Sequence, residues 1–297
     1  MKRNQFIKAL TLLPFTGMSM ELSDLKSITD NLPKSKRMPV LFVGHGSPMN
    51  AIEDNVFTRK MREIGNKIPT PNAILMVSAH WETKGTFVTA QDNPPTIHDF
   101  GGFPKALFDV QYPAPGSKWL ANETQKTITS TSVGLSEQWG FDHGAWSVTK
   151  NLFPNANIPM IQLSLDFTGN GAYHYELAKQ LSALRDKGVL IIGSGNMVHN
   201  FSYAQVKGMD FNQPFGHDWA LEANDLFKKY IINHEHAKLA DYKQLGKPVQ
   251  LAVPTPEHYL PLLYVLGVQQ KDDNITFFND VAVAGSFSMT SVVVGSV

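Results

Sequence analysis

Residues 73–80 read AILMVSAH, an apolar run that becomes polar only at its end. A strand with one face in water alternates apolar and polar residues, whereas a continuously apolar strand is typical of a parallel sheet that helices cover on both faces. Residues 38–43 (MPVLFV) and 189–193 (VLIIG) have the same character, and we predict further strands over residues 86–90 and 159–165. These segments predict a buried, largely parallel sheet.

Helical patterns alternate with these strands. Apolar residues recur at helical spacing in five segments, which we predict as helices: residues 55–65, 117–129, 172–187, 218–234 and 259–266. Two late strands, over residues 275–278 and 286–294, complete the sheet. The alternation predicts an α/β fold, a single domain with a central, mostly parallel or mixed sheet flanked by helices. No Ser/Gly-rich linker, charge block or repeat divides residues 37–297.

The composition limits the kinds of molecule that the protein is expected to bind. The chain has 297 residues, of which 42% are hydrophobic and 18% charged, so global disorder is excluded. Lys and Arg number 26 and Asp and Glu number 26, which gives a formal net charge of zero. A neutral surface has no net attraction for a phosphate backbone or an anionic membrane, so we expect neither nucleic acid nor membrane as a partner. Small molecules remain, and nothing in the sequence specifies an oligomeric state.

Residues 1–36 form a leader ahead of the predicted catalytic domain, residues 37–297. Lys2 and Arg3 precede a short apolar stretch over residues 6–15, an order that weakly resembles a secretory signal. Lys8 interrupts this stretch, which falls short of the roughly 20 apolar residues of a membrane span. No clear cleavage site follows, so cytoplasmic placement is favoured over periplasmic export.

The chain contains no cysteine but ten histidines. The absence of cysteine excludes disulfides, thiolate zinc sites, iron–sulfur clusters and cysteine nucleophiles. Any metal must therefore be bound by His, Asp or Glu.

Three histidines directly follow predicted strands. They are His45, His80 and His199, and the first and last lie in glycine-containing loops. Ligands of α/β sheets bind beyond the carboxyl ends of the strands, so side chains at these positions are candidates for chemistry. His143 and His258 lie at junctions between a loop and a helix, and His258 follows the rigid segment Pro-Thr-Pro-Glu. Imidazole is the commonest metal-binding side chain, and each of these histidines could also have a structural role.

Other residue patterns support competing chemistries less well. No glycine-rich nucleotide loop follows a strand, and no Walker motif is present. Ser47, Ser78 and Ser194 are conceivable nucleophiles, but none lies in the Gly-x-Ser-x-Gly turn of a serine hydrolase. Four other histidines lie in helical or polar surroundings that favour a structural role: His174, His217, His234 and His236.

Six motifs in matching order resemble the bacterial and plant 4,5-DOPA extradiol dioxygenase family, which belongs to the class III ring-cleaving dioxygenases. The motifs are GHGSPM at 44–49, SAHW at 78–81, TIHDFGGFP at 96–104, GFDHG at 140–144, SGNMVHN at 194–200 and PTPEHYLPL at 254–262. The resemblance runs from about residue 38 to the C-terminus. It implies a single α/β domain with one mononuclear divalent metal at the edge of the sheet.

The resemblance also implies the metal ligands. His45 and His80 match the two N-terminal ligands of the family, and His258 matches the position of a third. The related protocatechuate enzymes carry a Glu as the third ligand, and Glu257 is adjacent to His258 in this chain. One of the two is expected to bind the metal and the other to support it, and we favour His258 as the ligand.

Two further site residues follow from the same resemblance. His199 matches the acid/base residue that lies beside dioxygen, and it could also reach the metal, whereas His143 resembles a second catalytic histidine of the pocket. From the residues themselves, we expect His98, Trp81 and Phe103 to contact the substrate, because His98 lies in a stiff loop with aromatic residues and aromatic side chains suit a planar ring. The loop could also cap the sheet, and the aromatic residues could equally belong to the core.

The implied activity is extradiol opening of a catechol ring with O2 to a muconic semialdehyde-type product. L-DOPA or a related small catechol is the expected substrate, with Fe(II) needed for turnover and Zn(II) able to occupy the site. Two alternatives stay open. A zinc enzyme could hydrolyse a small ester or amide through metal-bound water, and a non-catalytic protein could bind the metal or an aromatic ligand.

Overall fold

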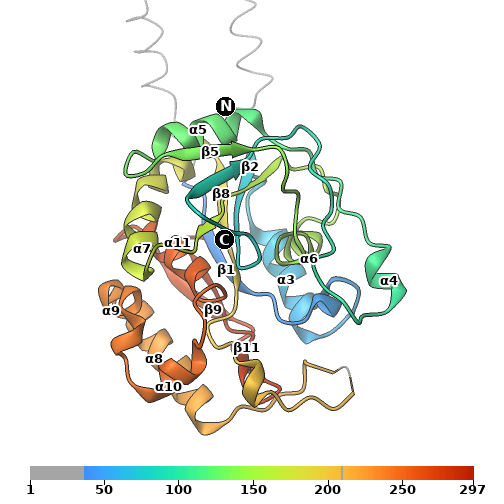
Figure 1. Cartoon of the computed structure of the whole chain (residues 1–297), viewed down its shortest axis with the longest axis vertical. Coiled ribbons are helices and arrows are strands. Elements are labelled where there is room, and N and C mark those ends of the chain that lie inside the picture. Colours follow the sequence, from blue (N-terminus) through green and yellow to red (C-terminus); the bar gives the residue numbers. More distant parts are fainter. Residues whose placement is uncertain (1–36, 209) are drawn as a thin grey trace, which may run out of the picture. The chain divides into compact units, whose positions relative to one another are not determined.

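A six-stranded mixed sheet forms the centre of the fold (Figure 1). The computed structural model describes residues 37–208 and 210–297, so the predicted leader lies outside the described residues. The strand order is β6 (Met160–Gln162), β2 (Ala73–Ser78), β8 (Val189–Gly195), β1 (Val40–Gly44), β12 (Ser291–Val294) and β9 (Ile275–Phe278). The first four strands are parallel to one another. β12 is antiparallel to β1, and β9 is antiparallel to β12. The predicted α/β class with a mostly parallel or mixed sheet is therefore confirmed.

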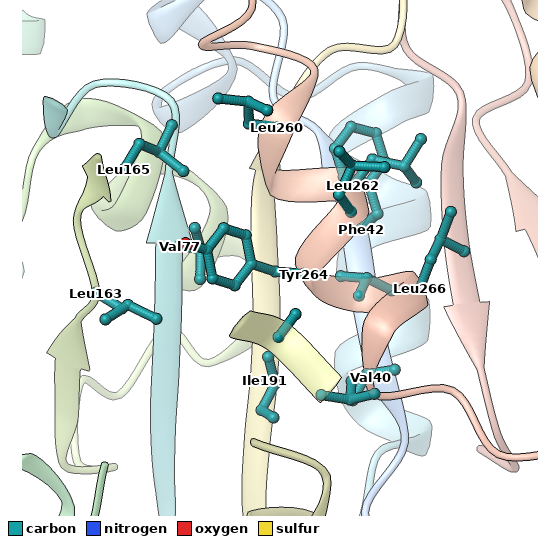
Figure 2. Close-up of a cluster of buried hydrophobic side chains, with 14 of the residues drawn as sticks. Val40, Phe42, Val77, Leu163, Leu165, Ile191, Leu260, Leu262, Tyr264 and Leu266 are labelled. Atoms are coloured by element: carbon teal, nitrogen blue, oxygen red, sulfur yellow. The ribbon is translucent and has the colours of Figure 1, made fainter. Parts of the chain in front are cut away.

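Helices cover both faces of this sheet. On one side lie α7 (Gly171–Lys179) and α11 (Leu260–Gly267), and on the other lie α3 (Val56–Lys67) and α6 (His143–Leu152) (Figure 1). Successive residues of a strand point to opposite faces, so the apolar run of each parallel strand supplies both cores. Figure 2 shows side chains of α11 lying over the strands, and every residue of this helix is buried.

Further helices and short strand pairs surround the sheet. The remaining helices are α4 (Lys105–Phe108), α5 (Lys118–Thr127), α8 (Asp218–Ile232), α9 (His236–Ala240) and α10 (Lys247–Ala252). Short 3-10 segments are η1 (Pro48–Ala51), η2 (Gln180–Lys187), η3 (Phe201–Tyr203) and η4 (Tyr242–Gln244). Three strand pairs lie outside the main sheet: β3 (Glu82–Thr83) with β7 (Leu165–Asp166), β4 (Thr86–Thr89) with β5 (Val133–Ser136), and β10 (Ala282–Val283) with β11 (Phe287–Ser288). Among the described residues, no helix is both long and apolar enough to cross a membrane.

Three predicted elements are divided in the structure, and a fourth lies outside the main sheet. The strand predicted over residues 159–165 is β6, which joins the main sheet, followed by the start of β7, which pairs with β3. The strand predicted over residues 86–90 is β4, which pairs with β5 and not with the main sheet. The strand predicted over residues 286–294 is wrong as one element, because β11 pairs with β10 and only β12 joins the main sheet. Between them the Thr290 hydroxyl lies 2.8 Å from Asn224 Oδ1 and 2.9 Å from Asp280 Oδ1. The helix predicted over residues 172–187 is α7 followed by η2, and it ends at Gly188, whose φ of 77° suits glycine.

The register of the parallel strands defines one edge of the sheet. β8 lies between β2 and β1, with Ser194 opposite Ser78 and Gly195 opposite Gly44. The backbone N–H of His45 continues the ladder by donating to the Gly195 carbonyl at 3.0 Å. The residues that follow the three strands therefore emerge side by side.

Candidate metal centre and pocket

Five imidazole rings gather at this edge of the sheet. The ring centroids of His45 and His80 are 5.1 Å apart, those of His45 and His258 are 5.3 Å apart, and those of His80 and His258 are 5.0 Å apart. His143, the first residue of α6, lies 3.8 Å from the His80 ring, and His199 stacks on His258 at 3.5 Å with an interplanar angle of 7°. Residues far apart in the sequence thus converge on one point.

The nitrogen positions divide the cluster into two groups. One ring nitrogen from each of His45, His80 and His143 lies within 4.8 Å of the other two, and His199, His258 and Glu257 offer a second such group. The ligand set expected from the resemblance takes two residues from the first group and His258 from the second. The structure therefore brings these three rings together. His143 lies nearer to His80 than His258 does, at 3.8 Å against 5.0 Å, and slightly farther from His45, at 5.8 Å against 5.3 Å.

Ser194 fixes the tautomer of His45. The Ser194 hydroxyl donates its single hydrogen to the Gly144 carbonyl at 2.7 Å, so toward the His45 Nδ1, 3.0 Å away, it can only accept. His45 Nδ1 must then carry the proton, and its Nε2 presents a lone pair to the cluster. Such an outer hydrogen bond is the usual support of a metal-binding histidine.

His258 has an equivalent support from its neighbour. His258 Nδ1 donates to the Glu257 carboxylate at 3.2 Å, and the same oxygen accepts from the Thr255 hydroxyl at 2.8 Å. This arrangement leaves His258 Nε2 free and occupies the Glu257 oxygen, which favours the histidine over the glutamate as the ligand.

Asp99 is a site residue to which the sequence analysis assigned no role. Its carboxylate accepts from the backbone N–H of His143 at 2.8 Å and from His143 Nδ1 at 2.9 Å, and it lies 3.6 Å from His80 Nδ1. Burial raises the pKa of Asp99, but the bonds from His143 outweigh that effect and hold it below its ordinary value. Its position next to His98 in the 96–104 motif was the available signal, but the sequence does not show which histidines it meets.

The distance between the ring nitrogens of His45 and His80 shows whether this cluster fits a metal. Their Nε2 atoms are 3.4 Å apart. With Nδ1 protonated on His45, its Nε2 lone pair faces His80 Nε2, which donates a hydrogen bond to it in one tautomer and presents a second lone pair to a shared cation in the other. Two imidazole nitrogens bound tetrahedrally to one metal at about 2.1 Å also lie about 3.4 Å apart. The donor set therefore fits a divalent metal.

Burial keeps these imidazoles neutral. Desolvation, followed by the neighbouring histidines, lowers the pKa of His45 and of His258 well below the ordinary value. The same causes lower the pKa of His80 to about 3, and desolvation lowers that of His199 to about 4. Metal binding requires neutral imidazole, so His45, His80 and His258 need no deprotonation near pH 7.

His199 differs from the other four rings in its hydrogen bonding. Within residues 37–208 and 210–297, no hydrogen bond joins its ring to the side chain of another residue, whereas its backbone N–H donates to the Ala252 carbonyl at 2.8 Å. The ring faces the pocket. A nitrogen that no protein group occupies can exchange a proton with a ligand.

The cluster forms the floor of a cavity of about 460 Å³. This volume lies within the range of small-molecule sites. Phe100 and Phe103 line one side, and their rings are 5.4 Å apart. Phe201, Phe211 and Phe287 line the side next to His199. The sequence analysis assigned no role to this second aromatic wall, although Phe201 directly follows the motif at 194–200 and Phe287 lies in the strand predicted over residues 286–294. Local pattern does not show that these residues meet Phe211 beside His199.

Two of the expected substrate contacts lie behind the pocket wall. His98 donates from Nε2 to the Val110 carbonyl at 3.0 Å and packs on Trp146, and it is not among the lining residues. Trp81 is buried and stacks on Trp139 at 6.0 Å, also outside the lining. Phe103 is the one of the three that lines the cavity. The positions of His98 and Trp81 favour a packing role.

Comparisons with known proteins agree with this geometry. The family model described as the catalytic LigB subunit of aromatic ring-opening dioxygenase matches residues 39–294. The chain belongs to this family. The motif-based resemblance is thus confirmed, and the protein is an enzyme of the extradiol, ring-opening dioxygenase class.

Individual relatives cover most of the chain. A protein of Escherichia coli (strain K12) named 4,5-DOPA dioxygenase extradiol is 46% identical over 90% of this chain and 98% of its own length. The protein of the same name from Beta vulgaris is 34% identical over 84% of this chain and 96% of its own. The crystal structure of an uncharacterized Escherichia coli K12 protein matches with a TM-score of 0.76 and 41% identity, covering 87% of this chain and all of that one. Members of the LigB family are metal-dependent, which agrees with the donor set of the histidine cluster.

Proposed function

We propose that this LigB-family protein opens the ring of a small catechol with O2 in the extradiol manner, using one mononuclear divalent metal. The observation that carries the proposal is the facing pair of Nε2 atoms on His45 and His80, 3.4 Å apart, at the floor of a cavity with aromatic walls. His258 completes the ligand set. L-DOPA is a candidate substrate because the relatives from Escherichia coli and Beta vulgaris carry its name.

The metal supplies redox chemistry that side chains lack, and Fe(II) is the form that supports reaction with O2, whereas Zn(II) fits the same imidazoles without redox activity. The residues of the chain supply binding and proton transfer. His199 is neutral at pH 7, since burial lowers its pKa to about 4, so it can accept a proton from a catechol hydroxyl and return it later. The Asp99 carboxylate holds His143 with Nε2 turned inward as a second hydrogen-bonding group.

The phenylalanine walls complete this arrangement. Phe100 and Phe103 on one side and the aromatic residues beside His199 on the other present apolar surface to a planar ring. They also exclude water from the reacting atoms, which strengthens the hydrogen bonds made by the histidines.

The test is anaerobic loading with Fe(II), followed by addition of catechol and oxygen. We expect oxygen consumption and a yellow ring-opened product with Fe(II), and neither with Zn(II). Ester hydrolysis by the zinc form without oxygen uptake would instead support the zinc hydrolase, which the all-imidazole donor set keeps open. Catechol binding with neither reaction would indicate a binding protein.

Three variants distinguish the proposed metal ligands from the proposed acid/base residue. His45→Ala and His80→Ala should abolish metal binding, because each removes a nitrogen that faces the centre. His199→Ala should retain the metal and lower turnover about 10² to 10⁴-fold, the usual contribution of a positioned acid/base. Equal metal loss in all three variants would make His199 a ligand and would overturn its assigned role.

A further inference from the structure

One carboxylate faces two of the clustered histidines. Asp99 lies in the loop before α4, and its side chain is 17% exposed. Its Oδ1 accepts from the backbone N–H of His143 at 2.8 Å, and its Oδ2 accepts from His143 Nδ1 at 2.9 Å. The same Oδ2 lies 3.6 Å from His80 Nδ1. Asp99 therefore lies behind one proposed metal ligand and behind one histidine that lines the cavity.

We propose that Asp99 is a positioning residue that sets the tautomers of His80 and His143 together, so that both rings turn an Nε2 lone pair toward the floor of the cavity. This inference rests on the proposed function and adds one residue on which metal binding and the hydrogen bonding of His143 both depend. It assigns to Asp99 itself no contact with the substrate.

His143 follows this rule in its simplest form. A backbone N–H can only donate, and an ionised carboxylate can only accept. With Oδ1 taken by the backbone N–H, the bond between Oδ2 and Nδ1 places the proton of the ring on Nδ1. Nε2 then carries a lone pair, and the buried ring lines the cavity. His143 can therefore accept a hydrogen bond from a ligand through Nε2.

His80 follows the same rule once a metal is bound. Its Nε2 is 3.4 Å from that of His45, so Nε2 is the atom that a shared cation takes. Nδ1 must then carry the proton, and Oδ2 of Asp99 is the acceptor that faces it. A carboxylate oxygen has two lone pairs, so Oδ2 can accept from both rings, whose centroids are 3.8 Å apart. Such a carboxylate also raises the basicity of the nitrogen that binds the metal.

The backbone N–H of His143 makes a carboxylate necessary at this position. An amide has one acceptor oxygen and one NH2 group. In Asp99→Asn the oxygen must stay with the backbone N–H, which cannot reverse its role, so the NH2 group faces His143 Nδ1. This nitrogen must then accept, and the proton of the ring moves to Nε2. The NH2 group also replaces the acceptor in front of His80 Nδ1, which favours the tautomer whose Nε2 cannot bind a metal.

Histidine tautomers can be read by NMR of protein that is isotopically labelled at the imidazole nitrogens. Spectra are recorded without metal and with Zn(II), and His80→Gln and His143→Gln identify the signals of the two rings. We expect Nδ1–H on His143 in both forms and on His80 in the zinc form, and Nε2–H on His143 in Asp99→Asn. A proton on Nε2 of His143 in the unchanged protein, or an unaltered tautomer in the variant, would overturn the proposal.

Metal affinity gives a second measure. Competition with a chelator should show that Asp99→Asn binds Zn(II) about 10 to 100-fold more weakly, as for other lost outer hydrogen bonds. Asp166→Asn is the matched control, because Asp166 is buried and also accepts from a backbone N–H, but its partner is Thr168, at 3.0 Å from the N–H and 2.7 Å from the hydroxyl. It should leave the affinity and both tautomers unchanged. An equal loss of affinity in the control would contradict the role of Asp99.

Asp99→Glu separates the effect of the acceptor oxygens from that of packing. It keeps two acceptor oxygens on a longer side chain, so His143 should retain the Nδ1–H tautomer that Asp99→Asn loses. Loss of this tautomer in both variants would show that the packing of Asp99 decides it, and would reject the proposal.

None of these measurements needs turnover, so they are independent of the proposed function. The expected tautomers and affinities in a protein that consumes no oxygen with catechol would reject the dioxygenase activity alone. Oxygen uptake by the Fe(II)-loaded protein, with unaltered tautomers in Asp99→Asn, would reject this inference alone.

Discussion

Ser194 controls the orientation of a proposed metal ligand without facing the metal itself. Its hydroxyl donates to the Gly144 carbonyl and accepts from His45 Nδ1, which keeps the Nε2 lone pair of His45 toward the centre. Ser194→Ala removes the acceptor and leaves the His45 ring free to change tautomer or rotate. We expect metal affinity to fall about 10 to 100-fold, as for other outer hydrogen bonds, measured by competition with a chelator of known affinity.

Ser164→Ala provides the control for this variant. Ser164 is equally buried and hydrogen-bonded, but its partners are Thr83 and Phe87, and no histidine is among them. It should match the loss of stability of Ser194→Ala while keeping metal affinity unchanged. Equal loss of affinity in both variants would show that packing, and not the tautomer of His45, is what Ser194 provides.

Gly195 shows how one element positions a residue of another. It ends β8, and a Cβ added there would lie 2.1 Å from the His258 carbonyl. The same approach allows the backbone N–H of Asn196 to donate to that carbonyl at 2.9 Å. Gly195→Ala must therefore displace the segment that carries His258. We expect a loss of stability of about 1 to 3 kcal/mol by urea unfolding, together with weakened metal binding.

Gly101→Ala is the comparison for stability. No atom lies within 4 Å of a Cβ added at Gly101, and its φ lies outside the left-handed region, so unfolding should be almost unaffected. Normal metal content in Gly195→Ala would mean that the segment before α11 adapts to the methyl group. The close approach of the two backbones would then have no role in placing His258.

At the level of elements, the sequence predicts what depends on local pattern. β1, β2 and β8 are continuous apolar runs, so their existence, and the exit of His45 and His80 at one edge, could be predicted. The division of residues 286–294 could not, because it consists in β11 and β12 pairing with different strands, and no local pattern identifies a strand's partner. The contact of Asp99 with His143 and the aromatic wall beside His199 are likewise tertiary, and no spacing rule reveals them.

A buried ion pair joins distant parts of the molecule. Arg185 is fully buried and binds the Asp273 carboxylate at 2.6 Å and 2.9 Å, and it also donates to the carbonyls of Met38 and Val268. Without Arg185, the buried Asp273 carboxylate keeps only the backbone N–H of Gln270 and the more distant guanidinium of Arg37, 3.5 Å away, and it loses its two strongest partners. We expect Arg185→Ala to lower the free energy of unfolding by about 3 to 5 kcal/mol, measured in urea.

The exposed pair of Arg59 and Asp54 supplies the contrast. Both side chains are largely exposed, so Arg59→Ala should change stability by no more than about 1 kcal/mol. Similar effects of the two variants would indicate that water reaches Arg185. Burial of the Arg185 charge would then not determine how much this residue contributes to stability.

The pH dependence of stability is a property of the whole chain, because buried histidines occur inside and outside the site. Burial lowers the pKa of His80 to about 3 and those of His199, His174 and His236 to about 4, against about 6.5 in an unfolded chain. Below pH 6.5 the unfolded chain binds protons that the folded chain does not, so the free energy of unfolding must fall as the pH falls toward 4. Each such group contributes a slope of at most about 1.4 kcal/mol per pH unit.

We expect the urea midpoint of the metal-free protein to drop steadily from pH 7 to pH 4.5. His174→Asn, which keeps an acceptor for the Tyr264 hydroxyl, should reduce the number of protons bound on unfolding by up to one and so make the fall in stability less steep. A midpoint that stays level over this range would mean that the histidines are protonated in the folded chain, and the neutral cluster proposed for metal binding would lose its electrostatic basis.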